Sequence, residues 1–271
     1  MDAISSTAFW VAAARARESV RPDALFHDPF AAALAGEEGE RWVREAPENA
    51  AMLGAFIAIR TLFFDEELAR AAASGVRQVV ILAAGLDARA YRLDWPAGTR
   101  VFEIDRPAVL AHKGGVLAAA GATPRCDRVT LGADLTLPFG DRLRAAGFAA
   151  DERSAWLVEG LLPYLHEPDV HYLLAQITSL STPGSALALD ATGVDLFSAP
   201  SFARMAAQLT ARGIHMHFGC DDPVGLLDTF GWRATRHGPR ELAARAGRTL
   251  VGRAESDDPA RAYLVSASRR G

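Results

Sequence analysis

Residues 79–89 read Val-Val-Ile-Leu-Ala-Ala-Gly-Leu-Asp-Ala-Arg, a short continuous apolar run that leads into a glycine. An apolar run of this length is typical of a strand that is buried on both faces of a parallel sheet. Gly85 would let the chain turn tightly after the strand and would let a ligand approach the backbone there. The segment therefore predicts a strand, a ligand-binding loop and the start of a helix.

Strand and helix patterns alternate along the rest of the chain. Helices are predicted over about residues 48–73 and 168–180, and another begins near Pro107. Further strands are predicted at 100–104, 128–131, 155–158, 185–190 and 232–236, and residues 262–266 form an edge or late-pairing strand. This alternation favours an α/β fold with a Rossmann-like, doubly wound, mostly parallel sheet.

Four segments of one expected domain follow from these patterns. Residues 1–75 form an N-terminal helical cap, and residues 76–190 form the cofactor-binding core. Residues 191–221 form a helical lid insertion, which is well placed to cover a ligand because it follows the carboxyl end of a strand. Residues 222–271 supply the C-terminal part of the sheet.

Composition excludes several classes of protein. The chain has 271 residues, of which 50% are hydrophobic, and 29 basic against 33 acidic residues give a net charge of −4. That balance lacks the basic surplus typical of nucleic-acid binding. No stretch approaches the roughly 20 apolar residues of a membrane span. Cys126 and Cys220 fit neither a disulfide framework nor a metal-ligand spacing, so we expect a cytoplasmic protein without a metal.

The loop chemistry indicates which ligand the core binds. Glu103 and Asp105 end the next predicted strand, where an acid can accept hydrogen bonds from ribose hydroxyls. A dinucleotide site needs three loop glycines, whereas this loop has only Gly85, and Asp87 would repel a phosphate. S-adenosylmethionine carries no phosphate, so the pattern favours a methyltransferase over a nicotinamide-dependent oxidoreductase. A plain strand-turn-helix with a packing glycine remains the alternative.

A set of short motifs runs in order from about residue 7 to residue 263. The motifs are Thr7-Ala-Phe-Trp-Val-Ala, Arg15-Ala-Arg-Glu-Ser19, His27-Asp-Pro-Phe30, Arg60-Thr61, Ile81-Leu-Ala-Ala-Gly-Leu-Asp-Ala-Arg-Ala-Tyr-Arg92, Phe102-Glu-Ile-Asp105 and Glu159-Gly-Leu-Leu-Pro-Tyr-Leu165. The set resembles the leucine carboxyl methyltransferase family, and most of all its bacterial branch that includes polyketide O-methyltransferases. The resemblance implies a sheet of the class I methyltransferase type, S-adenosyl-L-methionine as cofactor and S-adenosyl-L-homocysteine as product.

The resemblance also implies roles for single residues. It places Arg15 and Arg60 at the cofactor carboxylate, Ala83 and Gly85 in the cofactor loop with Asp87, Asp105 at the ribose, Asp134 and Leu135 at the adenine, Glu159 at the amino group and Tyr164 at the methyl group or acceptor. The eukaryotic members carry glycine where Ala83 stands. Glu103 is either a helper or a structural partner, and Asp134 also fits an ordinary loop cap.

The acceptor decides whether a base is needed. A carboxylate is ionised at pH 7, whereas a phenol with a pKa near 10 requires a general base. His215 and His217 alternate in the insertion and are candidate bases, although alternation also describes an ordinary extended segment. Six apolar residues could line an acceptor pocket or could equally be core: Phe9, Trp10, Phe197, Phe202, Met205 and Phe218.

The expected function is O-methylation that forms a methyl ester on a carboxylate of a small polyketide or aromatic acceptor, as in secondary metabolism. Methylation of a phenolic hydroxyl with a histidine base is one alternative. A non-catalytic protein that binds S-adenosylmethionine is another. Neither nucleic acid nor a membrane is an expected partner, and the oligomeric state is left open.

Overall fold

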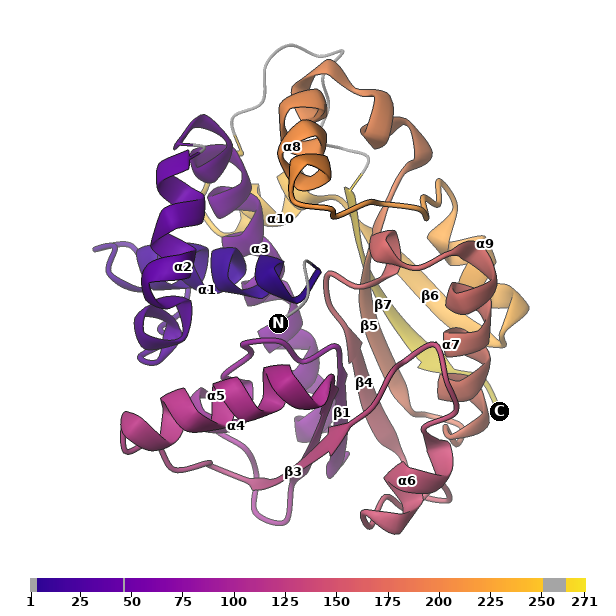
Figure 1. Ribbon diagram of the computed structural model, residues 1–271. Coiled ribbons are helices and arrows are strands. Elements are labelled where there is room, and N and C mark those ends of the chain that lie inside the picture. The colour runs from indigo at the N-terminus through magenta and orange to yellow at the C-terminus, as the bar shows by residue number, and fades with distance from the viewer. Residues whose placement is uncertain (1–3, 46, 251–261) are drawn as a thin grey trace.

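The computed structural model describes residues 4–45, 47–250 and 262–271. Its centre is a sheet in the order β3-β2-β1-β4-β5-β7-β6 (Figure 1). The strands are β1 Gln78–Leu82, β2 Arg100–Asp105, β3 Asp127–Gly132, β4 Ser154–Val158, β5 Ala186–Thr192, β6 Trp232–His237 and β7 Ala262–Arg269. The expected α/β fold with a doubly wound, mostly parallel sheet is confirmed.

Alternate residues of β1 serve two separate cores. Val79 and Ile81 belong to one apolar cluster, and Val80 and Leu82 belong to a second cluster on the opposite face. All five residues of β1 are buried, as the continuous apolar run predicts. The sheet is therefore covered on both faces around β1, and because β1, β2 and β4 are parallel, the loops that follow them leave the sheet at the same edge.

The last strand was expected to be an edge or a late-pairing strand, and the edge position is wrong. β7 is antiparallel and pairs with β5 on one side and with β6 on the other, so it is an interior strand and not an edge. Leu264 and Val265 are fully buried on opposite faces, which an edge position would not provide. β6 is the edge strand on this side of the sheet; its Trp232 is buried, whereas Arg233, Thr235 and Arg236 are exposed.

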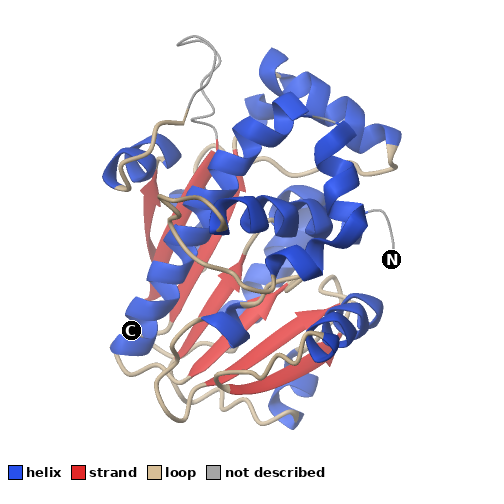
Figure 2. Cartoon of the chain, turned by 90° about the vertical axis from the view of Figure 1, so that its left-hand side faces the viewer, coloured by secondary structure: helices blue, strands red, loops and turns tan. Residues whose placement is uncertain are grey.

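Helices from both ends of the chain cover one face. The helical elements before β1 are η1 Ile4–Ser6, α1 Thr7–Ser19, α2 Ala31–Glu45 with a kink at Gly36, and α3 Pro47–Ala73. Later in the chain follow α4 Arg89–Arg92, α5 Pro107–Ala119 and α10 Pro239–Arg245. The helix expected over 48–73 is thus present as α3. Residues of α1, α3, α5 and α10 share the cluster that contains Val79. Figure 2 shows helices that stand over one end of the sheet.

The second face is covered by α6 Gly140–Ala145, α7 Glu167–Ser179 and α9 Pro223–Thr229. Between β5 and β6 lie η3 Val194–Ser198 and α8 Pro200–Ala211, and residues 215–219 form an extended segment without regular structure. Among the described residues, no helix combines the length and the apolar character that a membrane span requires.

Candidate active site

A cavity of about 270 Å³ lies at the carboxyl ends of the parallel strands. Parallel α/β sheets bind ligands at this edge. Its walls come from η1 and the start of α1, and from the segments that follow β1, β2, β3 and β4. The lining residues are Ser5, Thr7, Ala8, Ala83, Gly85, Asp105, Arg106, Val109, Ala133, Asp134, Leu135, Thr136, Gly160, Leu161, Tyr164, Leu165, His166 and Asp169.

The loop after β1 is bent by two residues in the left-handed region. Gly85 has φ 45° and Ala83 has φ 50°, and the latter is an uncommon conformation for a residue with a side chain. A Cβ on Gly85 would lie 3.3 Å from the Cβ of Ala8, so glycine lets α1 approach this loop closely. The structure places both predicted loop residues, Ala83 and Gly85, in the cavity wall.

Asp105 ties the end of β2 to that loop. Its Oδ2 accepts a hydrogen bond of 2.6 Å from the backbone N–H of Gly85, and its Oδ1 accepts one of 2.6 Å from Arg106. Burial raises the pKa of Asp105, although these two hydrogen bonds lower it. The side chain lines the cavity and stands where a ribose-binding acid is expected.

Glu103, the other acid of β2, is a structural partner. It is completely buried, and its Oε2 lies 2.7 Å from Lys113 Nζ and 2.6 Å from Arg128 Nη2. Of the two acids at the end of β2, Asp105 therefore lines the cavity, whereas Glu103 forms buried ion pairs with Lys113 and Arg128.

Asp134 and Leu135 lie together in the cavity wall after β3. Asp134 Oδ1 accepts hydrogen bonds from the backbone N–H of Thr136 at 3.0 Å and from its hydroxyl at 2.8 Å, and these bonds lower the pKa of Asp134. The carboxylate thus stabilises its own turn, as the loop-cap alternative predicts, while it still faces the cavity.

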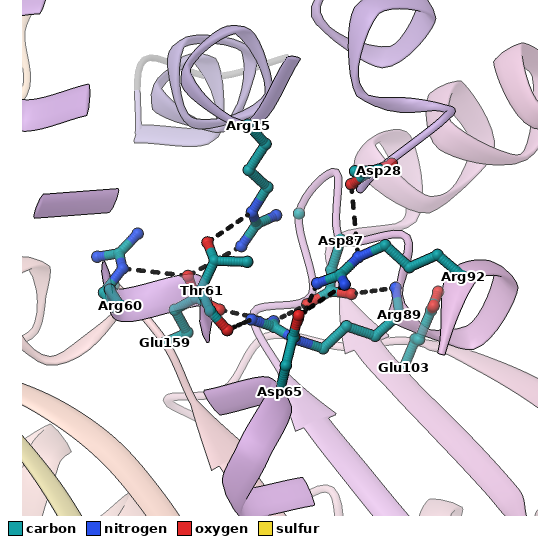
Figure 3. Close-up of polar contacts among 12 residues, drawn as sticks. Arg15, Asp28, Arg60, Thr61, Asp65, Asp87, Arg89, Arg92, Glu103 and Glu159 are labelled. Carbon is teal, nitrogen blue, oxygen red and sulfur yellow. Dashed lines mark hydrogen bonds and ion pairs between the residues drawn. The ribbon is translucent and has the colours of Figure 1, made fainter. Parts of the chain in front are cut away.

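Glu159 is the meeting point of three arginines (Figure 3). Its Oε1 accepts a hydrogen bond of 2.8 Å from Arg15 Nη2 and lies 3.1 Å from Arg60 Nε. Its Oε2 accepts one of 2.7 Å from Arg89 Nη1. Burial would raise the pKa of Glu159, but the three guanidinium groups outweigh burial and hold it far below its usual range.

Arg89 extends this network away from the cavity. Its guanidinium is completely buried, donates to Asp65 Oδ1 at 2.6 Å and also bonds Asp87 Oδ2. Asp87, predicted as a member of the cofactor loop, is 5% exposed and is not among the cavity-lining residues. Its carboxylate accepts the backbone N–H of Arg89, the first residue of α4, at 2.6 Å, so the structure gives Asp87 a supporting place behind the loop.

Asp190 closes the network on the side of β5. Its Oδ2 lies 3.0 Å from Arg60 Nη1, and its Oδ1 accepts a hydrogen bond of 2.6 Å from the backbone N–H of Gly160. The predicted site residues Arg15, Arg60 and Glu159 therefore come together directly behind the cavity, although none of the three is among its lining residues.

Tyr164 lies in the cavity wall within η2, Leu162–Tyr164. Burial raises the pKa of Tyr164, although Arg60 and a hydrogen bond with Thr7 act in the opposite direction. The phenolic group therefore keeps its proton at neutral pH and is available as a donor.

The histidines gather at the rim of the cavity. His166 lines it, and the His166 and His217 ring centroids are 4.1 Å apart. The backbone N–H of His217 donates to Pro163 at 2.7 Å, and the His215 ring is 6.4 Å from the His217 ring. Desolvation and the two neighbouring imidazoles lower the pKa of His217.

Most of the predicted acceptor-binding residues pack into cores. Phe9 belongs to the cluster with Val79, Phe218 to the cluster with Val80, and Phe202 and Met205 to a third cluster with Trp42. Trp10 is partly buried between the first and third of these. None of these five residues lines the cavity, and the side chain of Phe197 lies outside the described residues. Their contact with an acceptor stays a prediction.

Sequence reasoning missed Arg89, Asp190 and His166 as members of this region. The available signal for Asp190 was a carboxylate at the end of the apolar run 186–189, because charged residues are rarely buried unless they are paired; Arg89 lies close to Asp87 and Arg92 and gave a weaker signal. His166 gave no signal, since its ring neighbour His217 is distant in the sequence.

The residues present fit S-adenosylmethionine. Asp105 offers a half-buried carboxylate at the end of β2 for ribose hydroxyls, and Asp134 and Leu135 offer an acceptor and an apolar surface. The network of Arg15, Arg60 and Glu159 carries both charges that a zwitterionic amino-acid group requires. Among the described residues, no group of three or more potential metal ligands comes together.

Solved structures share this architecture. A DUF574 family protein from Streptomyces avermitilis matches with a TM-score of 0.64, at 18% identity and with 95% of this chain and 96% of that protein covered. At that identity the match speaks for the fold alone. The match confirms the predicted doubly wound α/β fold.

Sequence comparison names the family. Residues 8–178 match the model of the leucine carboxyl methyltransferase family. A proposed S-adenosylmethionine-dependent methyltransferase of Streptomyces coelicolor is 42% identical over 98% of this chain and 95% of its own length. Another from Parafrankia sp. is 49% identical over 70% of this chain, and the match spans 64% of that relative. The chain belongs to the leucine carboxyl methyltransferase family, a family of S-adenosylmethionine-dependent methyltransferases, so the resemblance read from the sequence and the predicted cofactor are confirmed.

Proposed function

We propose that this methyltransferase acts on oxygen and forms a methyl ester on a carboxylate of a small polyketide or aromatic acceptor. It does so in the cytoplasm, as a step of secondary metabolism. The family model, described as leucine carboxyl methyltransferase, supports a carboxyl acceptor. The observation that carries the proposal is a single cavity that joins the loop of Gly85 and Asp105 to Tyr164.

Gly85, Asp105, Asp134 and Leu135 would hold the adenosine part of the cofactor, because all four line the cavity. Arg15, Arg60 and Glu159 would hold its amino-acid part, with the arginines toward the carboxylate and Glu159 toward the ammonium group. When bound, S-adenosylmethionine supplies a methyl group on a positively charged sulfur.

The chain's own contribution to a carboxylate acceptor is placement. Such an acceptor is ionised near pH 7, so no residue has to remove a proton. Tyr164 keeps its proton and can donate a hydrogen bond to one acceptor oxygen, which orients the other. Correct placement of reactants can contribute about 7 to 11 kcal/mol to a barrier, so few catalytic side chains are needed.

The test supplies purified protein with methyl-labelled cofactor and matched aromatic and polyketide acids and phenols. We expect label in the acids, and we expect mild alkali to release it as methanol, because esters hydrolyse and aryl ethers do not. Alkali-stable label in phenols alone would contradict the ester. No transfer to any acceptor, with the cofactor bound, would favour the non-catalytic alternative.

A Tyr164→Phe variant should transfer label more slowly while its affinity for S-adenosylhomocysteine is unchanged.

Phenol methylation is the second candidate, and one observation favours it. His217 has a lowered pKa and stacks on His166 at the cavity rim, so a neutral imidazole stands close to the place where an acceptor would enter. The His215 ring is 6.4 Å from the His217 ring, whereas the His217 ring is 4.1 Å from that of the cavity-lining His166, so His217 is the better placed of the two predicted bases.

A further inference from the structure

We propose that Asp190 is a positioning residue of the cofactor site, which acts on the amino-acid end of the cofactor through Arg60. The inference rests on the proposed arrangement in which Arg15, Arg60 and Glu159 hold that end. It concerns binding and not the choice of acceptor. Asp190 touches neither the cavity nor Glu159 directly, so it is not proposed as a catalytic residue.

The two carboxylate oxygens of Asp190 contact different partners. The residue is 7% exposed and lies in β5, whose Leu189 is paired in register with Val158 at the end of β4. This register sets the Asp190 carboxylate beside the start of the loop that follows β4. One oxygen accepts the Gly160 N–H at 2.6 Å, and the other lies 3.0 Å from Arg60 Nη1.

Both contacts lead to the cofactor site. Gly160 lines the cavity with φ 65°, and a Cβ there would lie 3.3 Å from Arg60 Nη1. Arg60 therefore packs against the backbone of the cavity wall, and its Nε lies 3.1 Å from Glu159 Oε1. Asp190 thus fixes where the guanidinium of Arg60 stands relative to both the wall and Glu159.

Burial of the Asp190 carboxylate carries a desolvation penalty. A buried carboxylate loses hydration, and burial raises the pKa of Asp190 even though Arg60 and Gly160 oppose that change. Without Asp190, Arg60 would keep only Glu159 as a charged partner within 4 Å among the described residues. A guanidinium with two fixed carboxylates cannot turn away, which preserves its orientation toward a third anion.

The experiment compares two ligands in the variant Asp190→Asn. Asparagine keeps an oxygen for Gly160 and removes the charge that faces Arg60. Calorimetry measures the affinity for S-adenosylhomocysteine and for methylthioadenosine, which has the same adenosine and sulfur but no amino-acid group. We expect S-adenosylhomocysteine to bind about tenfold more weakly, as for a lost charge-assisted hydrogen bond, while methylthioadenosine changes by less than about threefold.

Glu18→Gln is the matched control. Glu18 is also buried, accepts the backbone N–H of Leu25 at 2.8 Å and pairs with Arg248 at 2.9 Å, but it lies outside the cofactor site. This variant should lose stability without a change in either affinity. Asp190→Glu, which keeps the charge but moves it by one methylene, should show the same selective loss and serves if the asparagine variant does not fold.

Equal affinity of wild type and both Asp190 variants for S-adenosylhomocysteine would overturn the inference. An equal loss for both ligands would also overturn it, because a general collapse of the cavity wall would then explain the result. Absence of ester formation by a wild-type protein that binds S-adenosylhomocysteine would refute the proposed acceptor and leave the role of Asp190 untouched.

Discussion

Glu159 illustrates how a buried carboxylate can stay ionised. Arg15, Arg60 and Arg89 surround it, so Glu159→Gln would leave three guanidinium groups without their shared anion. Breaking a buried ion pair costs about 3 to 5 kcal/mol, and we expect a loss of that order in the free energy of unfolding near pH 7. Glu40→Gln, which removes an exposed pair with Arg17, should cost less than about 1 kcal/mol.

The pH dependence of that loss follows from the lowered pKa of Glu159. An acid whose pKa is depressed by folding stabilises the protein fully above its ordinary pKa of 4.5 and loses that contribution as the pH falls toward its folded value. The difference between wild type and Glu159→Gln should therefore stay constant from about pH 7 to about pH 5 and shrink below that. Urea unfolding at several pH values measures it, and a difference that stays constant down to about pH 3 would contradict the ion-pair account.

Asp105 and Glu103 form a natural comparison at the end of β2. Asp105 lines the cavity and holds the N–H of Gly85, whereas Glu103 is buried between Lys113 and Arg128. We expect Asp105→Ala to weaken S-adenosylhomocysteine and methylthioadenosine alike, each by about tenfold, because it acts on the adenosine half. Glu103→Gln should lower the melting temperature and leave both affinities unchanged. The reverse pattern would exchange the roles of these two acids.

At the scale of elements, the region around β1 was predictable because local pattern and burial agree there. The apolar run gives β1, Gly85 gives the turn, and Pro107 gives the first turn of α5. The position of β7 was not predictable, because its sequence suits any half-buried strand and only pairing with β5 and β6 places it inside the sheet. Long-range pairing also decides which residues support the site. Asp190 meets Gly160 only because β5 lies beside β4.

The insertion element α8 is held by an apolar contact with α2. Trp42 packs with Phe202 and Met205, and the Arg212 guanidinium lies 3.5 Å from the centroid of the Trp42 ring. Trp42→Ala should cost about 3 to 5 kcal/mol of stability, whereas Arg212→Ala should cost less than about 1 kcal/mol because its side chain is partly exposed. Amide hydrogen exchange over 200–219 should become faster in the tryptophan variant. Unchanged exchange there would show that α8 is held by other contacts.

At the scale of the whole molecule, distant segments meet around one cavity. Residues that begin the chain, loops after four strands and the extended segment bonded to Pro163 all reach it or its rim. We infer from this convergence that the four segments expected from the sequence work as one methyltransferase domain. The cavity residues around Gly85 and Asp105 were predictable because they lie in contiguous motifs. The pairing of His166 with His217 was not, because their rings come together only through the tertiary fold.

The acceptor chemistry can therefore be tested through the behaviour of the complete enzyme. With a carboxylate acceptor, kcat/KM should be flat from about pH 6 to about pH 9, because the acceptor is already ionised. His217→Gln should then change kcat/KM by less than about threefold.

A phenol acceptor that depends on His217 would instead give a kcat/KM that decreases at pH values below the lowered pKa of this imidazole, since protonation removes the base. In that case His217→Gln would lower kcat/KM by about a hundredfold or more, with little change in S-adenosylhomocysteine affinity. His171→Gln is the matched control, because His171 lies on the outer side of α7 against Phe230; it should leave the pH dependence of kcat/KM unchanged with either acceptor.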